Sequence, residues 1–330
     1  MEGIERAAGA SANDLFQVRA LDARSQLTLK FQARAVVNAT GVWVDQLRRT
    51  ATPNGESHLV SPSQGVHVGV KREFMPGQQA LLVPKTQDGR VLFAVPWLGS
   101  VILGTTDTPR PDLPREPRPF EQELDFIFTE ASRVLSRPVT RADAQSVWVG
   151  LRPLVAVDQG QATKTLSREH TIVQEGNGLI TVTGGKWTTS RVMAEDTMRT
   201  CFQSGLLPER PTVRNETLVG APRGGSTQPI TEAPGLHLYG AEQADVQRLP
   251  GADRELGLGL TEAMVRYAAR HEWALTVEDV LARRWRVLFL DARLAQRMAE
   301  PVAALLREET GLDPELEQFL ALARSYALSD

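Results

Sequence analysis

Apolar and polar residues alternate along much of the first half of the chain, a pattern typical of strands that bury one face. The alternating runs are 15–19, 27–31 and 65–70, and further strands are predicted at 79–84, 91–95, 100–105, 146–157, 163–169 and 170–174. Tight turns are expected at 22–25, 88–89 and 98–99. Because the later runs are joined by such short turns, they predict an antiparallel sheet.

Helical spacing of apolar residues begins at Phe120 and continues to Arg137, where Pro138 ends it. Residues 109–119 contain five prolines and predict an extended crossing instead. Residues 207–235 are rich in Pro, Gly, Thr and Arg and predict a linker. Four further helices are predicted at 261–271, 276–285, 294–310 and 314–326.

Two stretches have the order strand, glycine turn, helix. In Leu179–Arg191 the turn is Gly184-Gly185-Lys186, and in residues 35–49 it is Thr40-Gly41. Such a junction directs unpaired backbone N–H groups and the positive end of a helix dipole toward whatever lies in front of it. Two interpretations are open at this point: an ordinary strand-to-helix turn, or a loop that faces an electron-rich ligand.

Two polar residues stand inside otherwise apolar strands. Arg152 lies within Gly150–Leu154, and its charge needs a partner because an isolated buried charge is costly. His67 points to the side of its strand opposite to Val66 and Val68. A histidine in that position is either structural or catalytic.

Composition narrows the classes of function. The 330 residues carry a net charge of -3, which argues against a nucleic-acid-binding protein. No apolar run approaches the roughly 20 residues that span a bilayer, and the N-terminus does not have the pattern of a secretory signal. Cys201 is the only cysteine, so we expect a packed thiol and no internal disulfide or cysteine-based metal site. The hydrolase elbow Gly-x-Ser-x-Gly and the zinc motif His-Glu-x-x-His are absent too, and no metal is expected.

Five motifs occur in an order that matches one known family. They are Val37–Asp45, Gly104–Asp107, Gly150–Leu154, Gly184–Thr189 and Val277–Arg284. The chain resembles FAD-dependent glycerol-3-phosphate dehydrogenase of the aerobic, membrane-associated type, and the resemblance runs from Leu15 to Tyr326. Where the family's turn often continues with proline, Val42 follows Gly41 here, and proline at a first helical position is only a preference.

The resemblance implies an α/β (α+β) fold: a partial FAD-binding Rossmann-like domain, an antiparallel β-sheet substrate domain and a C-terminal helical domain. The implied parts are a remnant of the FAD-binding domain (1–60), the mostly antiparallel substrate or cap domain (61–177), a strand, glycine turn and helix that return to the FAD domain (178–206), a linker (207–235) and the helical domain (236–330). The family's Gly-x-Gly-x-x-Gly strand, which holds the FAD pyrophosphate, does not occur in this sequence. An N-terminally truncated form is therefore expected, and we expect the isolated chain to bind FAD weakly.

The family also implies the site. FAD is the expected cofactor, and its expected contacts are Ala39, Thr40, Gly41, Gly184, Gly185, Thr188 and Thr189. Arg152, Arg168 and Lys186 are implied to line the glycerol-phosphate site, because guanidinium forks suit a phosphate dianion. His67 and Lys186 are the implied catalytic residues. His67 would remove the proton of the C2 hydroxyl, and Lys186 would stabilise negative charge on the flavin or the substrate oxygen.

The implied reaction is the oxidation of sn-glycerol 3-phosphate to dihydroxyacetone phosphate in glycerol catabolism, with electrons passed to quinone. Two alternatives stay open: a glycerol-3-phosphate oxidase that reduces oxygen to peroxide, and a catalytically inactive remnant or binding module. The expected partners are the substrate, quinone and a second copy in a homodimer, with no nucleic acid. The family implies a cytoplasmic protein with peripheral contact at the inner face of the plasma membrane.

Overall fold

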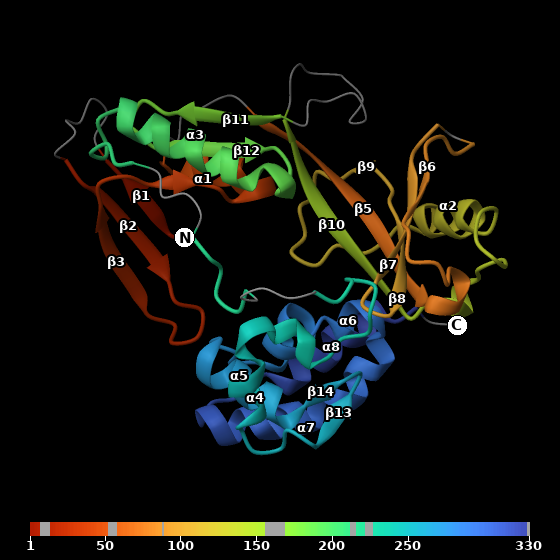
Figure 1. Cartoon of the computed structure of the whole chain (residues 1–330). Helices are drawn as coiled ribbons and strands as arrows, with labels where there is room; N and C mark the ends of the chain where they lie inside the picture. Colours follow the sequence, from red (N-terminus) through yellow and green to blue (C-terminus); the bar gives the residue numbers. More distant parts are fainter. Residues whose placement is uncertain are drawn as a thin grey trace. The chain divides into compact units, whose positions relative to one another are not determined.

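A computed structural model of the chain describes residues 1–6, 14–51, 58–87, 89–155, 169–211, 216–221 and 227–328. The chain divides into two compact units. Unit 1 comprises Met1–Gly65, Asp107–Pro117 and Gly150–Asn215, and unit 2 comprises Val66–Thr106, Arg118–Val149 and Glu216–Asp330. Figure 1 shows the helices and strands of both units. The five-part division inferred from the sequence stays a prediction.

Unit 1 begins with an antiparallel sheet of three strands in the order β1-β2-β3. The strands are β1 (Gly3–Glu5), β2 (Phe16–Leu21) and β3 (Thr28–Ala33). Phe16 pairs with Ala33 and Leu21 with Thr28, which confirms the predicted hairpin. β1 was not expected, because its three residues are too short to show a period.

The second sheet of unit 1 has the order β11-β12-β4. It contains β4 (Val37–Asn38), β11 (His170–Gln174) and β12 (Ile180–Gly184). β12 is antiparallel to β11 and parallel to β4. A 3-10 turn and then a helix follow β4 and also β12: Gly41–Trp43 with α1 (Val44–Ala51), and Trp187–Thr189 with α3 (Ser190–Gln203). Both predicted strand-glycine-helix junctions are therefore confirmed.

A larger sheet has the strand order β10-β5-β8-β7-β6, and β9 pairs with β5. Its strands are β5 (Val60–Lys71), β6 (Leu81–Val83), β7 (Leu92–Trp97), β8 (Ser100–Gly104), β9 (Thr108–Pro109) and β10 (Ser146–Val155). The pairs β5·β8, β6·β7 and β7·β8 are antiparallel, as predicted. The pair β5·β9 is antiparallel too, although no strand was predicted at Thr108–Pro109. Leu98 and Gly99 have φ of 47° and 78°, the left-handed geometry of a two-residue hairpin. β5 and β10 have residues in both units.

Within unit 2, one face of this sheet packs on α2 (Glu121–Ala131). The buried side chains of this core include Val66, Val68, Val70, Leu92, Leu103, Leu124 and Ile127. Short 3-10 turns at Arg72–Phe74 and Arg141–Asp143 connect the elements around it. The helix predicted to reach Arg137 was too long. The Ser132 hydroxyl donates to the carbonyl of Val139 and accepts from its N–H, and the backbone turns there instead of continuing.

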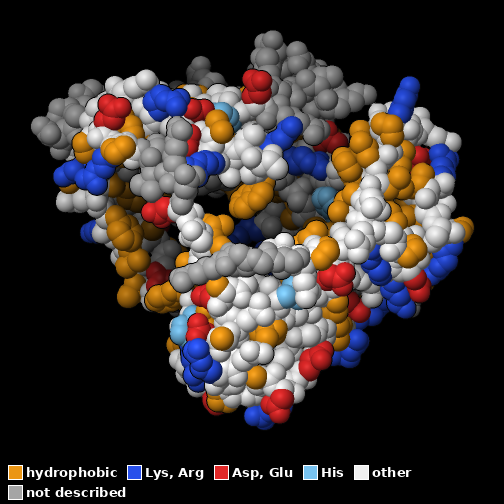
Figure 2. All heavy atoms as spheres, viewed as in Figure 1, with side chains coloured by type: hydrophobic (Ala, Val, Ile, Leu, Met, Phe, Trp, Pro, Cys, Tyr) orange, Lys and Arg blue, Asp and Glu red, His pale blue; other side chains and the backbone are white. Residues whose placement is uncertain are grey.

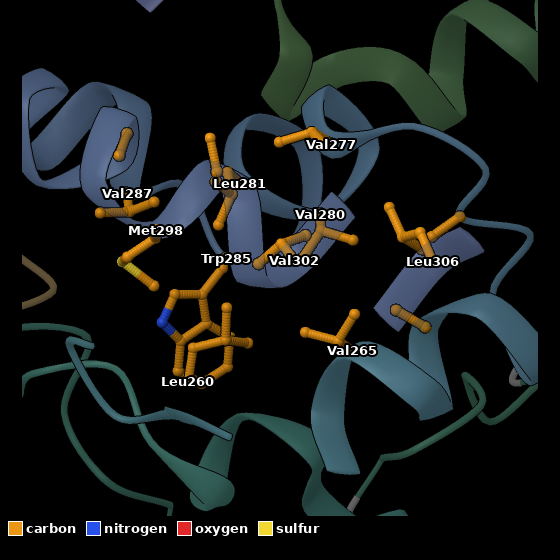
Figure 3. Close-up of a cluster of buried hydrophobic side chains, with 14 of the residues drawn as sticks. Leu260, Val265, Val277, Val280, Leu281, Trp285, Val287, Met298, Val302 and Leu306 are labelled. Carbon is orange, nitrogen blue, oxygen red and sulfur yellow. The ribbon is translucent and has the colours of Figure 1, made fainter. Parts of the chain in front are cut away.

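The C-terminal part of unit 2 is mainly helical. It contains a 3-10 helix (Leu236–Glu242), α4 (Gln243–Gln247), β13 (Glu255–Gly257), β14 (Leu260–Thr261), α5 (Glu262–His271), a π-helix (Asp279–Arg284), α6 (Val287–Leu290), α7 (Ala292–Thr310) and α8 (Leu316–Tyr326). The predicted helix at 276–285 is thus a π-helical turn. Side chains from α5, the π-helix and α7 point toward one another in a large buried cluster (Figure 3). Within it, Trp285 Nε1 donates to the carbonyl of Leu258 at 2.9 Å.

Two arginines of α5 bind one carboxylate of α7. Arg266 Nη1 lies 2.5 Å from Glu309 Oε1, and Arg270 Nε lies 2.6 Å from Glu309 Oε2. The Glu309 side chain is only 7% exposed. The hydrogen bonds from Arg270 and Arg266 hold the pKa of Glu309 below its ordinary value. The ionised form is therefore bound more tightly in the folded protein than in the unfolded chain.

Glu309→Gln should consequently reduce the free energy of unfolding by about 1–3 kcal/mol near neutral pH, because it removes charge-assisted hydrogen bonds. The wild-type contribution is fully present above the unfolded pKa of a glutamate, roughly 4.3, and is lost as the pH falls through the lower folded pKa. Urea unfolding between neutral and acidic pH measures this. The glutamine variant should lose less stability on acidification than wild type. Glu300→Gln, at an exposed position of the same helix, should show the same loss of stability on acidification as wild type.

Candidate functional site

The two glycine turns of unit 1 lie at the same edge of a sheet. β4 and β12 run parallel, with Val37 opposite Ile180 and Asn38 opposite Thr181. The chain therefore leaves both strands in the same direction. This brings together Ala39, Thr40 and Gly41 after β4 with Gly184, Gly185 and Lys186 after β12, residues that are far apart in the sequence.

Asn38 fixes the first turn. This residue is fully buried, and its Nδ2 donates to the carbonyl of Val44 at 2.9 Å and to Thr181 Oγ1 at 3.3 Å. Thr40 Oγ1 donates to Asn38 Oδ1 at 2.7 Å. Gly41 has φ of 62°, and a Cβ there would meet nothing within 4 Å, so the outer side of this turn is open. The role of Asn38 was not predicted, although an amide between a buried strand and a glycine turn is a signal for it.

The second turn needs both of its glycines. Gly184 and Gly185 have φ of 75° and 71°, in the left-handed region. A Cβ would lie 2.6 Å from the Glu169 carbonyl oxygen at Gly184 and 2.5 Å from Met193 Sδ at Gly185. A side chain at either position would strain the backbone and collide with its neighbours, so the path of the chain into Lys186 is set here.

The residues that follow are open to solvent. Lys186, Thr188 and Thr189 are exposed, and Trp187 is 91% exposed. The Lys186 N–H donates to Thr189 Oγ1 at 3.2 Å, and this hydroxyl donates to the Lys186 carbonyl at 3.0 Å. The Lys186 ammonium has no carboxylate partner within the described part of the chain. A full positive charge therefore stands at the mouth of the turn.

A histidine–aspartate pair lies beside this turn. His170 is opposite Gly184 in the β11–β12 register, and its Nε2 lies 3.0 Å from Asp196 Oδ2 on α3. Asp196 Oδ1 also accepts from Arg199 at 2.6 Å. The pair joins the strand to the helix that Lys186 precedes. Sequence reasoning missed it because the two residues are separated by 26 positions.

Arg152 has the partners that its charge requires. Its Nη1 lies 3.5 Å from Asp107 Oδ1 and 3.3 Å from the Gln64 carbonyl oxygen, all within unit 1. The side chain is 29% exposed, so the guanidinium is anchored but still reaches solvent. A Cβ at Gly65 would lie 2.0 Å from Arg152 Nη2. Glycine at this position leaves the space that the guanidinium occupies.

A second arginine, which the sequence did not single out, shares a neighbour with Arg152. Arg110 Nη1 donates to Gln64 Oε1 at 2.6 Å, and its Nε lies 2.6 Å from Asp112 Oδ1. Gln64 is fully buried, and the Arg110 side chain is only 12% exposed. Gln64 therefore contacts one guanidinium through its backbone and another through its side chain. Arg168, the other predicted phosphate ligand, lies outside the described residues, as does most of the predicted strand from Thr163 to Glu169.

His67 lies in unit 2, on the sheet face opposite to the core. Val66 and Val68 are fully buried, which confirms the predicted alternation. His67 lines a hollow of about 360 Å³ together with Phe93, Val95, Trp97, Ile102, Gly104, Thr105 and Trp148. Its ring stacks on Trp148, with centroids 5.7 Å apart and planes 16° from parallel. Hydrophobic side chains also gather over β6 and β7 on the surface in Figure 2, where Leu82, Val91 and Phe93 are exposed.

The described residues offer no candidate metal site. They contain no group of three or more His, Cys, Asp or Glu side chains that could hold a metal ion. None of the helices in this part of the chain has the length and the apolar character that a membrane span needs. Cys201 is buried, as predicted, and burial raises the pKa of its thiol.

Comparisons with known proteins agree on one family. Residues 3–195 match the family model described as FAD dependent oxidoreductase, and residues 235–317 match the C-terminal domain of alpha-glycerophosphate oxidase. The chain is 35% identical over 309 residues to a mitochondrial glycerol-3-phosphate dehydrogenase of Arabidopsis thaliana, covering 84% of this chain and 49% of that protein. It is 37% identical over 311 residues to a probable mitochondrial glycerol-3-phosphate dehydrogenase of Caenorhabditis elegans, covering 85% and 42%. The chain thus spans about half the length of the curated relatives it matches.

A solved structure gives the same answer for the fold. The glycerol-3-phosphate dehydrogenase of Bacillus halodurans, complexed with FAD, is 26% identical, with a TM-score of 0.77 over 98% of this chain and 69% of that one. The predicted mixed α/β fold with antiparallel sheets and a C-terminal helical region is confirmed. The chain belongs to the FAD-dependent oxidoreductase family and, within it, to the glycerol-3-phosphate dehydrogenase group.

Proposed function

We propose that this protein oxidises sn-glycerol 3-phosphate to dihydroxyacetone phosphate with FAD as cofactor, and that the electrons pass to quinone. The main support for the proposal is the way in which the residues around Arg152 fix its guanidinium. Its guanidinium is held by Asp107 and Gln64, reaches solvent and lies in a space that Gly65 keeps open. A fixed planar fork of donors suits a phosphate dianion better than a mobile charge does.

The phosphate site in this proposal consists of Arg152, Arg168 and Lys186. Lys186 supplies a point charge that no carboxylate within the described residues neutralises, beside a turn that two left-handed glycines fix. A cation placed there stabilises negative charge that develops on the substrate oxygen during the reaction. In this proposal Lys186 therefore has two roles, one in substrate binding and one in catalysis.

His67 removes the proton from the C2 hydroxyl, because a neutral imidazole nitrogen can accept a proton from an alcohol held beside it. Oxidation of the alcohol takes this proton from oxygen and a hydride from C2, which leaves the carbonyl of dihydroxyacetone phosphate. FAD, when bound, supplies the acceptor for the two electrons of the hydride. The protein side chains orient the substrate and accept the proton.

The residues of unit 1 fit such a cofactor. The turn at Gly41 is open on its outer side, and the turn at Gly184 and Gly185 lies at the same sheet edge. Ala39, Thr40, Gly41, Gly184, Gly185, Thr188 and Thr189 are the residues that we assign to FAD. The 3-10 turn at Trp187–Thr189 opens the 14-residue helix α3, whose N-terminal dipole favours electron-rich groups.

The electron acceptor separates two candidate functions. The match of residues 235–317 to a domain described for an alpha-glycerophosphate oxidase favours oxygen as the alternative acceptor. Because we expect the chain to bind FAD weakly, the assay uses FAD in excess, with binding checked by flavin fluorescence. Under these conditions the protein should oxidise sn-glycerol 3-phosphate, reduce a quinone analogue and form dihydroxyacetone phosphate without peroxide. Peroxide formed in step with oxygen consumption would identify an oxidase. No product with either acceptor would contradict the proposed reaction and favour an inactive remnant or a binding module.

The proposal extends to the setting of the protein in the cell. Because quinones reside in the lipid bilayer, we assign the protein to the cytoplasm with peripheral contact at the inner face of the plasma membrane. We also propose a homodimer. Co-sedimentation with lipid vesicles and light scattering of the purified chain test these two points separately.

A further inference from the structure

Four rings follow one another through unit 2, from the sheet into the C-terminal helices. His67 on β5 stacks on Trp148 of β10 at 5.7 Å and 16°. Trp148 meets Phe289 of α6 edge-on at 5.4 Å and 76°, and Phe289 meets Tyr326 of α8 at 5.8 Å and 71°. Centroid separations of this size are typical of attractive aromatic pairs. We call these four residues the aromatic column.

The backbone of the neighbouring strand restricts where the imidazole of His67 can lie. Gly104 on β8 is the cross-strand partner of His67. A Cβ at Gly104 would lie 2.5 Å from His67 Cδ2 and 3.0 Å from the Val66 carbonyl oxygen, so glycine is required for the ring to lie across the neighbouring strand. The imidazole is thus fixed by the backbone of β8 and by the indole of Trp148.

Two hydrogen bonds connect the chain around Phe289 to the chain around Trp148. Ser146 Oγ donates to the Leu288 carbonyl at 2.7 Å, and the Ala292 N–H donates to the Gln145 carbonyl at 3.0 Å. A Cβ at Gly69 would lie 2.9 Å from the Phe289 carbonyl oxygen, so β5 also approaches α6 closely. These contacts fix the backbone on both sides of Trp148 and Phe289 and so restrict how far either ring can shift.

The column is separate from the buried core of the sheet. Val66, Val68 and Val70 pack with α2 on one face, whereas His67 and Trp148 line the hollow on the other. Stability of the sheet alone would not require an aromatic stack at the wall of an open hollow. A ring that presents its nitrogen to a reacting group benefits from such a support, because misplacement by about 1 Å can cost on the order of a hundredfold in rate.

We propose that Trp148 and Phe289 are positioning residues for His67, and that the C-terminal helices thereby set the orientation of the imidazole. The proposal rests on the assigned role of His67 as the base that receives the C2 hydroxyl proton. It gives the helical region an indirect part in the chemistry, through ring contacts that lead to His67. Trp148 contacts the imidazole of His67, and Phe289 acts through its contact with Trp148.

The test uses NMR of the full chain with 13C-labelled histidine. The chain has five histidines, so the His67→Asn variant identifies the His67 ring signal. In Trp148→Leu this signal should move downfield, because the shielding by the stacked indole is lost. In FAD-reconstituted protein, kcat should fall by tenfold to a hundredfold, with little change in KM for sn-glycerol 3-phosphate. Trp148→Phe should recover most of the signal position and of kcat.

Phe289→Leu provides an independent second variant, and Phe319→Leu is its matched control. Phe319 is buried in the helical core on α8, and it has no ring contact with the column. Phe289→Leu should move the His67 signal and lower kcat, whereas Phe319→Leu should lower stability alone. An unmoved His67 signal in Trp148→Leu, or equal effects of the two phenylalanine variants, would overturn the positioning role. Full kcat in His67→Asn would instead overturn the proposed role of His67, so the two failures are distinguishable.

Discussion

Arg152→Ala is expected to raise KM for sn-glycerol 3-phosphate by about 10- to 150-fold, while KM for glycerol changes little. Charge-assisted hydrogen bonds are worth about 1.5–3 kcal/mol, and each 1.36 kcal/mol corresponds to a factor of ten. Glycerol has no phosphate and cannot lose these bonds. Steady-state kinetics with both substrates measure the difference.

Two variants make this result specific. Arg152→Lys keeps the charge and loses the planar fork, so its KM should fall between those of wild type and alanine. Arg141→Ala removes an exposed arginine that pairs with Glu121 and Asp125 on the surface, and it should leave both substrates unchanged. Equal changes of KM for glycerol and its phosphate in Arg152→Ala would exclude Arg152 from the phosphate site. Thermal unfolding of each variant measures the loss of stability that follows from breaking the ion pair between Arg152 and Asp107. This separates an effect on folding from an effect on substrate binding.

Gly65→Ala is expected to weaken binding of the phosphorylated substrate almost as much as Arg152→Ala, although it changes no charge. The added Cβ would lie 2.0 Å from Arg152 Nη2 and 2.5 Å from its Cζ. The guanidinium must therefore leave its position between Gln64 and Asp107. Gly65 does not have a positive φ, so the backbone accepts alanine and the collision with Arg152 is the main effect.

Gly150→Ala is the matched control for this variant. Gly150 lies two residues before Arg152 on the same strand, and a Cβ there would meet nothing within 4 Å. KM for sn-glycerol 3-phosphate should rise by about tenfold or more in Gly65→Ala and stay near the wild-type value in Gly150→Ala. The double variant Gly65→Ala/Arg152→Ala should be no worse than Arg152→Ala, because both act on one guanidinium. Additive losses would show that Gly65 acts elsewhere.

The local parts of the fold were predictable because their signals lie within short stretches of sequence. Alternation gave the antiparallel strands and the side to which His67 points, and the two glycine junctions gave the turns before α1 and α3. Errors arose where a side chain ended an element. The apolar stripe of α2 continues past Ala131, yet the Ser132 hydroxyl binds Val139 and turns the chain.

Contacts between distant residues had no such signal. The importance of Gln64 is visible only in the fold, where both Arg110 and Arg152 contact it. The pair of His170 and Asp196 and the stack of His67 on Trp148 belong to the same class. None of these partners is a neighbour along the chain, so residue type and spacing could not reveal them.

By itself, the sequence determined the residue types of the site, the strands and helices that carry them, and the family to which their order corresponds. The periodicity of apolar residues and the positions of glycines are local properties, and they can be recognised without knowledge of the fold. Only the tertiary structure decided which side chains contact one another. It brought the two glycine turns to one sheet edge, gave Arg152 its anchor and its space, and set the His67 ring on Trp148. Such contacts depend on how separate strands come together, and pairing across a sheet is not encoded in any one of them.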